Sequence, residues 1–277
     1  MMRGLLLIAL LAAGSMPFAS ASAAMQKACE APEDVVGVVT PLPHVAAVLK
    51  PGSTLNILAI GSASLFGPEA SLAPGSLTAQ AMSGATATTV PSVPSVQIMN
   101  TPSTTAFPQQ MAKQLETAVP GMKVHVVARG GRGLSAADQL QVLEQSLPLE
   151  RFDLVIWQTG TVEAVRNLPP TEFAQTLAEG AGQAEQAGAD LVLIDPQFSR
   201  FLQTNSNIEP YEQAFQQLGS IHGVLLFRRF DLMRNWVNEG QIDLERTPKG
   251  DRKRAVELLH ACLGAHLSRL IISAARS

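Results

Sequence analysis

Five short runs of apolar residues recur along the chain, and each has the length of a β-strand. The runs are Leu55–Ile60, Val124–Val127, Leu154–Trp157, Leu191–Ile194 and Val224–Phe227. Their hydrophobicity is mostly continuous rather than alternating, which is typical of strands that helices cover on both faces. The pattern therefore predicts five parallel strands in the interior of one sheet.

The segments between these runs show helical periodicity and carry helix start and stop residues. The predicted helices cover Pro108–Val119, Ser135–Gln145, Pro170–Ala187, Pro210–Leu218 and, near the end of the chain, Ala255–Ala274. Gly188 supplies a stop signal after the third of them. Strands that alternate with helices predict a doubly wound α/β fold, in which ligands bind beyond the carboxyl ends of the strands.

The stretch 68–106 interrupts this alternation. It is rich in Ala, Ser, Thr and Pro, and its single charged residue is Glu69. Structureless loops of this length are uncommon in compact domains, where they are either disordered segments or functional lids. We expect a disordered, low-complexity insertion. Because the stretch follows directly on the first strand, a lid over the site is the alternative.

The first 24 residues have the layout of a secretory signal peptide. Arg3 precedes an apolar run from Leu5 to Ala13, and small residues follow from Ala19 to Ala24. This layout predicts a single domain over 25–277 that resides in the periplasm or outside the cell. The apolar run is too short to span a bilayer, so we expect no membrane span after the signal is removed. A retained membrane anchor is the alternative.

Cys29 and Cys262 are the only cysteines of the chain. In an oxidising compartment they predict one disulfide that ties the two ends of the domain together, and two buried free thiols are the alternative. Closing so long a loop contributes roughly 5 kcal/mol to stability in the chain-entropy model.

Composition narrows the functional classes. The 277 residues are 46% hydrophobic and 16% charged, which suffices for one domain with a substantial core. With 20 basic and 23 acidic residues and no long run of Lys or Arg, the sequence predicts no nucleic-acid partner. We expect no metal and no cofactor, because no metal-ligand spacing links four of the five histidines to one another or to a cysteine: His44, His125, His222 and His266. Oligomeric state is not predicted.

Several segments together resemble the secreted SGNH (GDSL-type) hydrolases of bacteria, and they span almost the whole chain outside 1–24 and 68–106. They read PLPHV (41–45), LNILAIGSASLFG (55–67), ARGGRG (128–133), DLVIWQTGT (153–161), DPQF (195–198), VLLFRRFDLMRNW (224–236) and HACL (260–263). The resemblance implies a flavodoxin-like, five-stranded parallel sheet in three α/β/α layers. Members of that family hydrolyse or transfer acyl esters, often on carbohydrates, without a metal.

Four conserved blocks carry the chemistry of that family, and this chain departs from three of them. The position of the nucleophilic serine holds Ala63, whose methyl group cannot attack a carbonyl. The oxyanion-hole glycine is matched by Gly130, but Val162 replaces the oxyanion-hole asparagine, and losing one such donor costs about 10²- to 10³-fold in rate. In the Asp-x-x-His block Asp251 is retained, whereas the histidine position holds Arg254, a permanent cation that accepts no proton.

These replacements predict a protein without hydrolase activity, because losing the nucleophile and the base of a serine triad costs on the order of 10⁶-fold. The ligand-binding candidates that remain around the former acyl site are Arg129, Arg132, Glu163 and Arg254. If the arginines converge there, the site favours an anionic group on a glycan or acylated ligand. The alternative is that Arg254 pairs with Asp251 or Glu163 and fills the cavity.

Two other functions stay open from the sequence. Ser62 or Ser64 with His260 would make an active serine esterase that acts on esters or acetylated carbohydrates. Neighbouring side chains on a tight turn point in different directions, however, and a misplacement of about 1 Å costs roughly 10²-fold. In the resemblance His260 falls where a packing aromatic sits, which favours a structural histidine. A purely structural protein of the cell envelope is the third function.

Overall fold

The five apolar runs form the five parallel strands that the sequence predicts. This computed structural model describes residues 29–73, 97–99, 101–219 and 223–277. The five strands are β1 Thr54–Gly61, β3 Lys123–Arg132, β4 Leu154–Gln158, β5 Asp190–Ile194 and β6 Val224–Phe227. Their order in the sheet is β3-β1-β4-β5-β6, and each neighbouring pair is parallel. The direction of winding therefore changes between β1 and β4, which is the switch point of a doubly wound sheet.

A sixth strand extends the sheet beyond this prediction. β2, Gln97–Met99, pairs antiparallel with the last residues of β3. A short 3-10 turn, η2 Ala63–Phe66, and the helix α3 Pro68–Leu72 follow β1. The expectation of a structureless stretch over 68–106 is thus wrong for both of its ends, while 74–96 and 100 lie outside the described residues.

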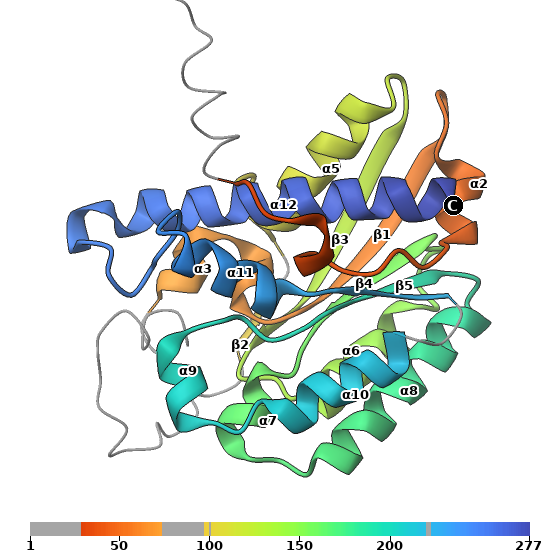
Figure 1. The fold of residues 1–277 in the computed structure, drawn as a ribbon. Coiled ribbons are helices and arrows are strands. Elements are labelled where there is room, and N and C mark those ends of the chain that lie inside the picture. The colour runs from red at the N-terminus through yellow and green to blue at the C-terminus, as the bar shows by residue number, and fades with distance from the viewer. Residues whose placement is uncertain (1–28, 74–96, 100, 220–222) are drawn as a thin grey trace, which may run out of the picture.

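The predicted helices are present, and their ends differ from the prediction by at most three residues. They are α5 Phe107–Ala118, α6 Ala136–Ser146, α8 Pro170–Gln186, α10 Glu209–Gly219 and α12 Arg252–Arg276. Figure 1 shows α5 and α12 on one face of the sheet and α6, α8 and α10 on the other. The shorter elements had no clear sequence signal: η1 Glu33–Val35, α2 Pro43–Val48, α7 Thr161–Arg166, α9 Arg200–Asn205, α11 Arg229–Asn238 and η3 Lys249–Asp251.

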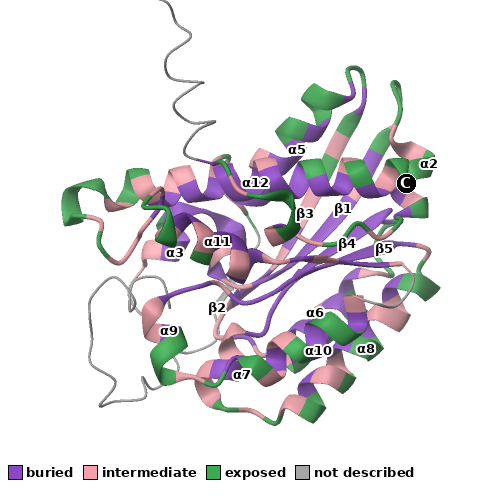
Figure 2. Ribbon diagram, in the orientation of Figure 1, coloured by how far each residue is buried: buried purple, intermediate pink, exposed green. Residues whose placement is uncertain are grey.

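Coverage on both faces explains why the strands are apolar throughout. Every residue of β4 and β5 is buried (Figure 2). The close approach of α8 to β4 depends on Gly180, because a Cβ at this position would lie 2.2 Å from Cζ3 of Trp157. β4 and β5 are therefore held firmly, and the polar residues that follow them have little freedom of position.

The segment PLPHV anchors the amino end of the sheet. It forms the start of α2, where both carboxylate oxygens of the buried Asp190 are engaged: one lies 2.9 Å from His44 Nδ1, and the other accepts the backbone N–H of Val45 at 2.9 Å. These contacts fix α2 at the beginning of β5. They lie at the opposite edge from the carboxyl ends of the strands.

Cys29 and Cys262 form the predicted disulfide. Two further contacts hold the segment after Cys29 in place: Trp236 Nε1 donates to the backbone oxygen of Glu30 at 3.0 Å, and His266 Nε2 lies 2.6 Å from that of Cys29. Burial lowers the pKa of His266 to about 4. The beginning of the described chain is thus joined to α11 and α12, whereas the predicted signal peptide over 1–24 lies outside the described residues.

The stretch Lys249–Arg276 is long and apolar enough, by length and composition, to cross a membrane. Its helix α12 packs along α5 and buries its apolar side in the domain. Packing in the core therefore accounts for the apolar character of this helix.

Candidate functional site

The carboxyl ends of three neighbouring strands bring three of the four family positions to one edge of the sheet. Gly130 pairs with Gly61 in the register of β1 and β3. Ala63 follows two residues after β1, and Val162 lies in the first turn of α7 after β4. This edge includes the switch point between β1 and β4, where open α/β sheets bind ligands.

The contact between Gly130 and Gly61 leaves no room for a side chain. A Cβ on Gly130 would lie 2.0 Å from the backbone oxygen of Gly61, and the φ of Gly130 is +140°. Glycine tolerates both the backbone conformation and the close approach. Gly130 therefore has a structural reason to be glycine that is separate from the oxyanion role implied by the resemblance.

Gln158, the last residue of β4, binds both hydroxyls beside the nucleophile position. It is only 3% exposed. Its Nε2 donates to Ser62 Oγ at 2.7 Å, and its Oε1 accepts from Ser64 Oγ at 2.8 Å. A neutral amide does not take up a proton, so Gln158 cannot act as the base for either serine. Ala63 itself is 6% exposed.

Glu163 is buried and bound by backbone groups. One of its carboxylate oxygens accepts the N–H of Ala136, and the other accepts the N–H of Gly160 at 3.0 Å. The carboxylate thus joins the first turns of α6 and α7, where unpaired N–H groups and the helix dipoles favour an anion. Burial nevertheless raises the pKa of the Glu163 carboxyl. This geometry makes Glu163 a capping residue rather than a ligand-binding one.

The cavity between these groups is small. It is lined by Ser62, Gln158, Val162 and Glu163 among others, and its volume is about 10 Å³. A space of this size holds about one water molecule. The cavity therefore has no room for an acyl chain or a sugar ring.

The fourth family position lies at the start of α12. Asp251 and Arg254 are both exposed. Lys253, one of the two residues between them, pairs through Nζ with Glu69 Oε1 of α3 at 2.6 Å. Among the described residues no ion pair joins Arg254 to Asp251 or to Glu163. The arrangement in which Arg254 fills the cavity through such a pair is thus not formed.

The two predicted ligand-binding arginines of β3 are half-buried. Successive side chains of a strand alternate between the two faces of the sheet, so Arg129 and Arg132, three residues apart, belong to opposite faces. The register of β3 does not bring both of them to one anion.

His260 is engaged away from the serines. The residue is 2% exposed, and its Nδ1 accepts the backbone N–H of Phe107 at 3.1 Å. Nε2 lies 3.4 Å from Ser71 Oγ. Burial and the nearby Arg229 guanidinium lower the pKa of His260 to about 3. A general base works best with a pKa near the operating pH, so this imidazole is a poor candidate for one.

Two buried ionisable residues lie near the end of β5, and the sequence did not predict their contacts. Arg229 Nε donates to the backbone oxygen of Asp195 at 3.1 Å, and Asp195 Oδ1 accepts the N–H of Phe230 at 2.8 Å. Burial raises the pKa of Asp195 to about 8 and lowers that of Arg229 to about 10. These groups connect the DPQF turn with the first turn of α11.

The sequence contains one feature that could have pointed to Gln158 as a site residue: it is a polar residue directly after the apolar run LVIW. Glu163 stands three residues after Gly160, the spacing at which a glutamate reaches back to the N-terminus of its own helix. The backbone partner from α6, in contrast, is 27 residues away in the sequence. Only the fold reveals that second contact.

The chain has relatives among known protein families. A sequence model of the Non-GDSL lipase-like family matches residues 74–277, well over half of the chain. The chain belongs to the Non-GDSL lipase-like family. This membership confirms the predicted SGNH-type relationship, and the matched region contains the second, third and fourth blocks but not Ala63. No curated protein matches this family member.

Solved structures of hydrolases share the fold of this Non-GDSL lipase-like protein. A two-domain esterase active on acetylated mannans has a TM-score of 0.57 at 12% identity, covering 88% of this chain and 57% of that one. A mutant of an acetyl-xylooligosaccharide esterase from Geobacillus Stearmophilus gives 0.53 at 13%, covering 81% and 96%. A lipase/acylhydrolase from Enterococcus faecalis gives 0.49 at 14%, covering 78% and 94%. At 12% and 13% identity the likeness to the two esterases concerns the fold alone, and it agrees with the predicted three-layer SGNH hydrolase fold.

Proposed function

We propose that this protein is an exported member of the Non-GDSL lipase-like family that does not hydrolyse esters. One observation carries the proposal: Gln158 binds the hydroxyls of both Ser62 and Ser64, while His260 is bound to Phe107 and Ser71. Within the described part of the chain, neither serine beside Ala63 is hydrogen-bonded to a base. The disulfide between Cys29 and Cys262 supports export to an oxidising compartment.

The size of the expected loss in catalytic rate supports an inactive protein rather than a slow enzyme. Without an activated nucleophile and a base, the catalytic contribution of a serine triad, on the order of 10⁶-fold, is lost. The amide of Gly130 is the remaining oxyanion donor that the family blocks retain. A single donor supplies about 10²- to 10³-fold.

The test is hydrolysis of nitrophenyl acetate by the purified, disulfide-bonded protein, together with labelling by a fluorophosphonate probe. We expect the same background rate for the wild type, for Ser62→Ala and for Ser64→Ala, and no labelled serine. Ser273→Ala, an exposed serine on α12, is the matched control. Turnover that disappears in Ser62→Ala or Ser64→Ala but persists in Ser273→Ala would show an active esterase.

The second part of the proposal is a glycan or acylated ligand bound at the carboxyl edge of the sheet. The fold is shared with esterases of acetylated mannans and acetyl-xylooligosaccharides, which makes acetylated oligosaccharides of these two types the first probes. The cavity beside Val162 is too small for a sugar, so such a ligand would lie across the outer side of the edge.

Titration calorimetry with acetylated and deacetylated xylo-oligosaccharides tests this second part. We expect binding of the acetylated form, weakened by Arg129→Ala, because Arg129 lies at the end of β3 beside Gly130. Lys123→Ala, at the opposite end of the same strand, is the control. Binding of neither form would favour the purely structural envelope protein.

A further inference from the structure

Five basic residues lie within nine positions around the start of α12. They are Arg246, Lys249, Arg252, Lys253 and Arg254, and we call the segment 246–254 the basic tip. Its single acidic residue is Asp251, so the basic tip has a net charge of +4 in a chain of net charge −3, which leaves −7 for the rest. The basic tip thus opposes the sign of the remaining molecule.

The basic tip is exposed at one end of the domain. Figure 1 shows the start of α12 and the turn before it at the left-hand end of the described fold, and Figure 2 shows exposed residues there. Lys249, Lys253 and Arg254 are exposed, and the side chain of Arg246 is 80% exposed. Four of the five charges therefore face solvent, whereas Arg252 is half-buried.

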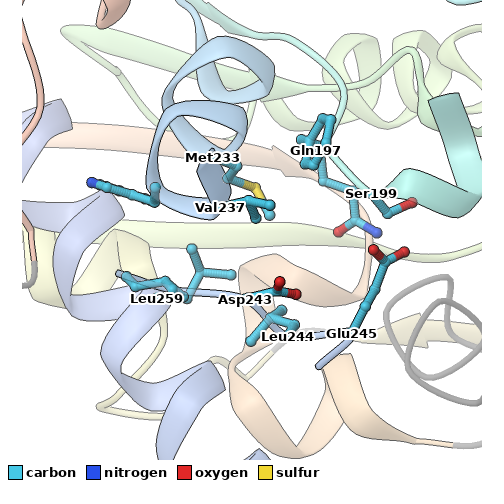
Figure 3. Close-up of a pocket in the computed structure, with 11 residues that line it drawn as sticks. Gln197, Ser199, Met233, Val237, Asp243, Leu244, Glu245 and Leu259 are labelled. Carbon is cyan, nitrogen blue, oxygen red and sulfur yellow. The ribbon is translucent and has the colours of Figure 1, made fainter. Parts of the chain in front are cut away.

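Acidic residues of the chain neutralise the basic tip only in part. Lys253 pairs with the exposed Glu69, and Arg246 Nε lies 3.8 Å from Asp243 Oδ2. Asp243 is shared with Arg200, whose Nη2 lies 2.9 Å from the same carboxylate oxygen. Asp243 and Glu245 both line a neighbouring pocket (Figure 3).

Two of the five charges have no acidic partner. Within the described residues Lys249 and Arg254 form no ion pair and no side-chain hydrogen bond. The sequence of 1–28, 74–96, 100 and 220–222 contains no Asp or Glu, so the acidic residues of the chain all belong to its described part. No other segment of the chain supplies a carboxylate for them.

The position of the basic tip is also unfavourable within the domain. The N-terminus of a helix carries partial positive charge, which repels cations placed in the first turn. Lys253 and Arg254 lie in the first turn of α12. Because Lys253 is paired with Glu69, Arg254 is the charge of this turn that is available to an external anion, and it adds nothing to helix stability.

We propose that the basic tip binds the surface of a bilayer that carries anionic lipid headgroups. Arg252, Lys253 and Arg254 are consecutive, so at about 100° per residue they do not line one side of α12. A protruding basic end of this kind meets a flat surface, whereas a linear polyanion fits a stripe or a groove. Segment 243–254 has no aromatic residue, so it offers single-stranded nucleic acid no stacking platform.

Vesicle sedimentation tests this proposal with the purified, disulfide-bonded protein. We expect binding to vesicles of phosphatidylcholine mixed with phosphatidylglycerol, and none to phosphatidylcholine alone. The binding should weaken with added salt, because the Debye length falls from about 10 Å at 0.1 M to about 3 Å at 1 M. The double variant Lys249→Gln with Arg254→Gln should lower the partition coefficient roughly 25-fold, about fivefold per charge.

The control is Lys50→Gln with Lys113→Gln, which changes the net charge equally at exposed sites outside the basic tip. We expect this variant to bind like the wild type. Thermal unfolding should be unchanged or slightly improved in Lys249→Gln with Arg254→Gln, since neither side chain has a partner among the residues that the structure describes. Equal losses in both double variants, undiminished binding without the two charges, or binding to dextran sulfate but not to anionic vesicles would overturn the proposal. None of these outcomes depends on esterase activity.

Discussion

His260 Nδ1 accepts the backbone N–H of Phe107 at 3.1 Å, at the buried contact between α12 and α5. A nitrogen that accepts this bond cannot carry a proton, so the contact requires a neutral ring. Protonation would remove the acceptor and place a cation near Arg229, consistent with a pKa of about 3. The histidine that the sequence offered as a substitute base thus has a structural role between two helices.

Replacing His260 by Asn should change how stability depends on pH. The native pKa of about 3 lies below the ordinary value of 6.5, so between these values the unfolded state binds more protons. The wild type should therefore lose stability relative to His260→Asn as pH falls from 6.5 toward 3, by at most about 1.4 kcal/mol per pH unit. Urea unfolding at both ends of this window measures the difference.

His125→Asn is the control for this measurement, because the side chain of His125 is 55% exposed. The buried Asp195 and His266 titrate in both the wild type and His260→Asn, so their contributions cancel in the comparison. Parallel pH profiles for the wild type and His260→Asn would contradict the structural role.

Removing the Glu163 carboxylate should destabilise the fold. In Glu163→Ala the N–H groups of Ala136 and Gly160 lose their acceptor, at about 1–3 kcal/mol for each buried group left unpaired. The stability of Glu163→Gln should lie between that of the wild type and that of Glu163→Ala, because an amide keeps one acceptor but directs a donor at the other N–H. Chemical denaturation measures both, with the exposed Glu172→Ala as control. Equal stability of Glu163→Ala and Glu172→Ala would refute the capping role.

Sequence pattern predicted the sheet well because its strands are buried on both faces and so read as continuous apolar runs. The predicted helices between them were placed to within three residues, since Pro170 and Gly188 mark starts and stops through backbone geometry. α3 and β2 were missed because a stretch of Ala, Ser, Thr and Pro has no period, and β2 pairs with β3 through its backbone.

The functional edge was less predictable. Register alone brings Ala63, Gly130 and Val162 to one edge, as the family blocks imply. The side-chain contacts at this edge could not be predicted in the same way. Gln158 binds two hydroxyls that lie 96 and 94 residues before it, and no local sequence spacing encodes these contacts. Glu163 looked like a ligand-binding group because its partners are backbone atoms, which the sequence cannot show.

The disulfide should contribute strongly to stability. Its cysteines are separated by 233 residues, and closing so long a loop contributes roughly 5 kcal/mol in the chain-entropy model. We expect a reductant to lower the melting temperature of the wild type and to leave that of a Cys29→Ala and Cys262→Ala double variant unchanged. Calorimetry with and without reductant measures this. If the reductant lowered both melting temperatures equally, the change would not arise from the disulfide, and the prediction would be wrong.

Two glycines on one helix provide a test of core packing. Both lie on α8, where a Cβ at Gly180 would stand 2.2 Å from the ring of Trp157, while a Cβ at Gly182 would meet no atom within 4 Å. Gly180→Ala should therefore destabilise the fold by about 1–3 kcal/mol, the usual range for overpacking a core.

Gly182→Ala should instead leave stability unchanged or raise it by about 0.5–1 kcal/mol, because alanine loses less backbone entropy in a helix. Urea unfolding of the two variants, prepared in parallel, gives the comparison. The same substitution two residues apart thus isolates the contact with Trp157 from helix propensity. If Gly180→Ala were as stable as Gly182→Ala, α8 would not pack against β4 as closely as described, and the placement of Gln158 at the end of that strand would lose its support.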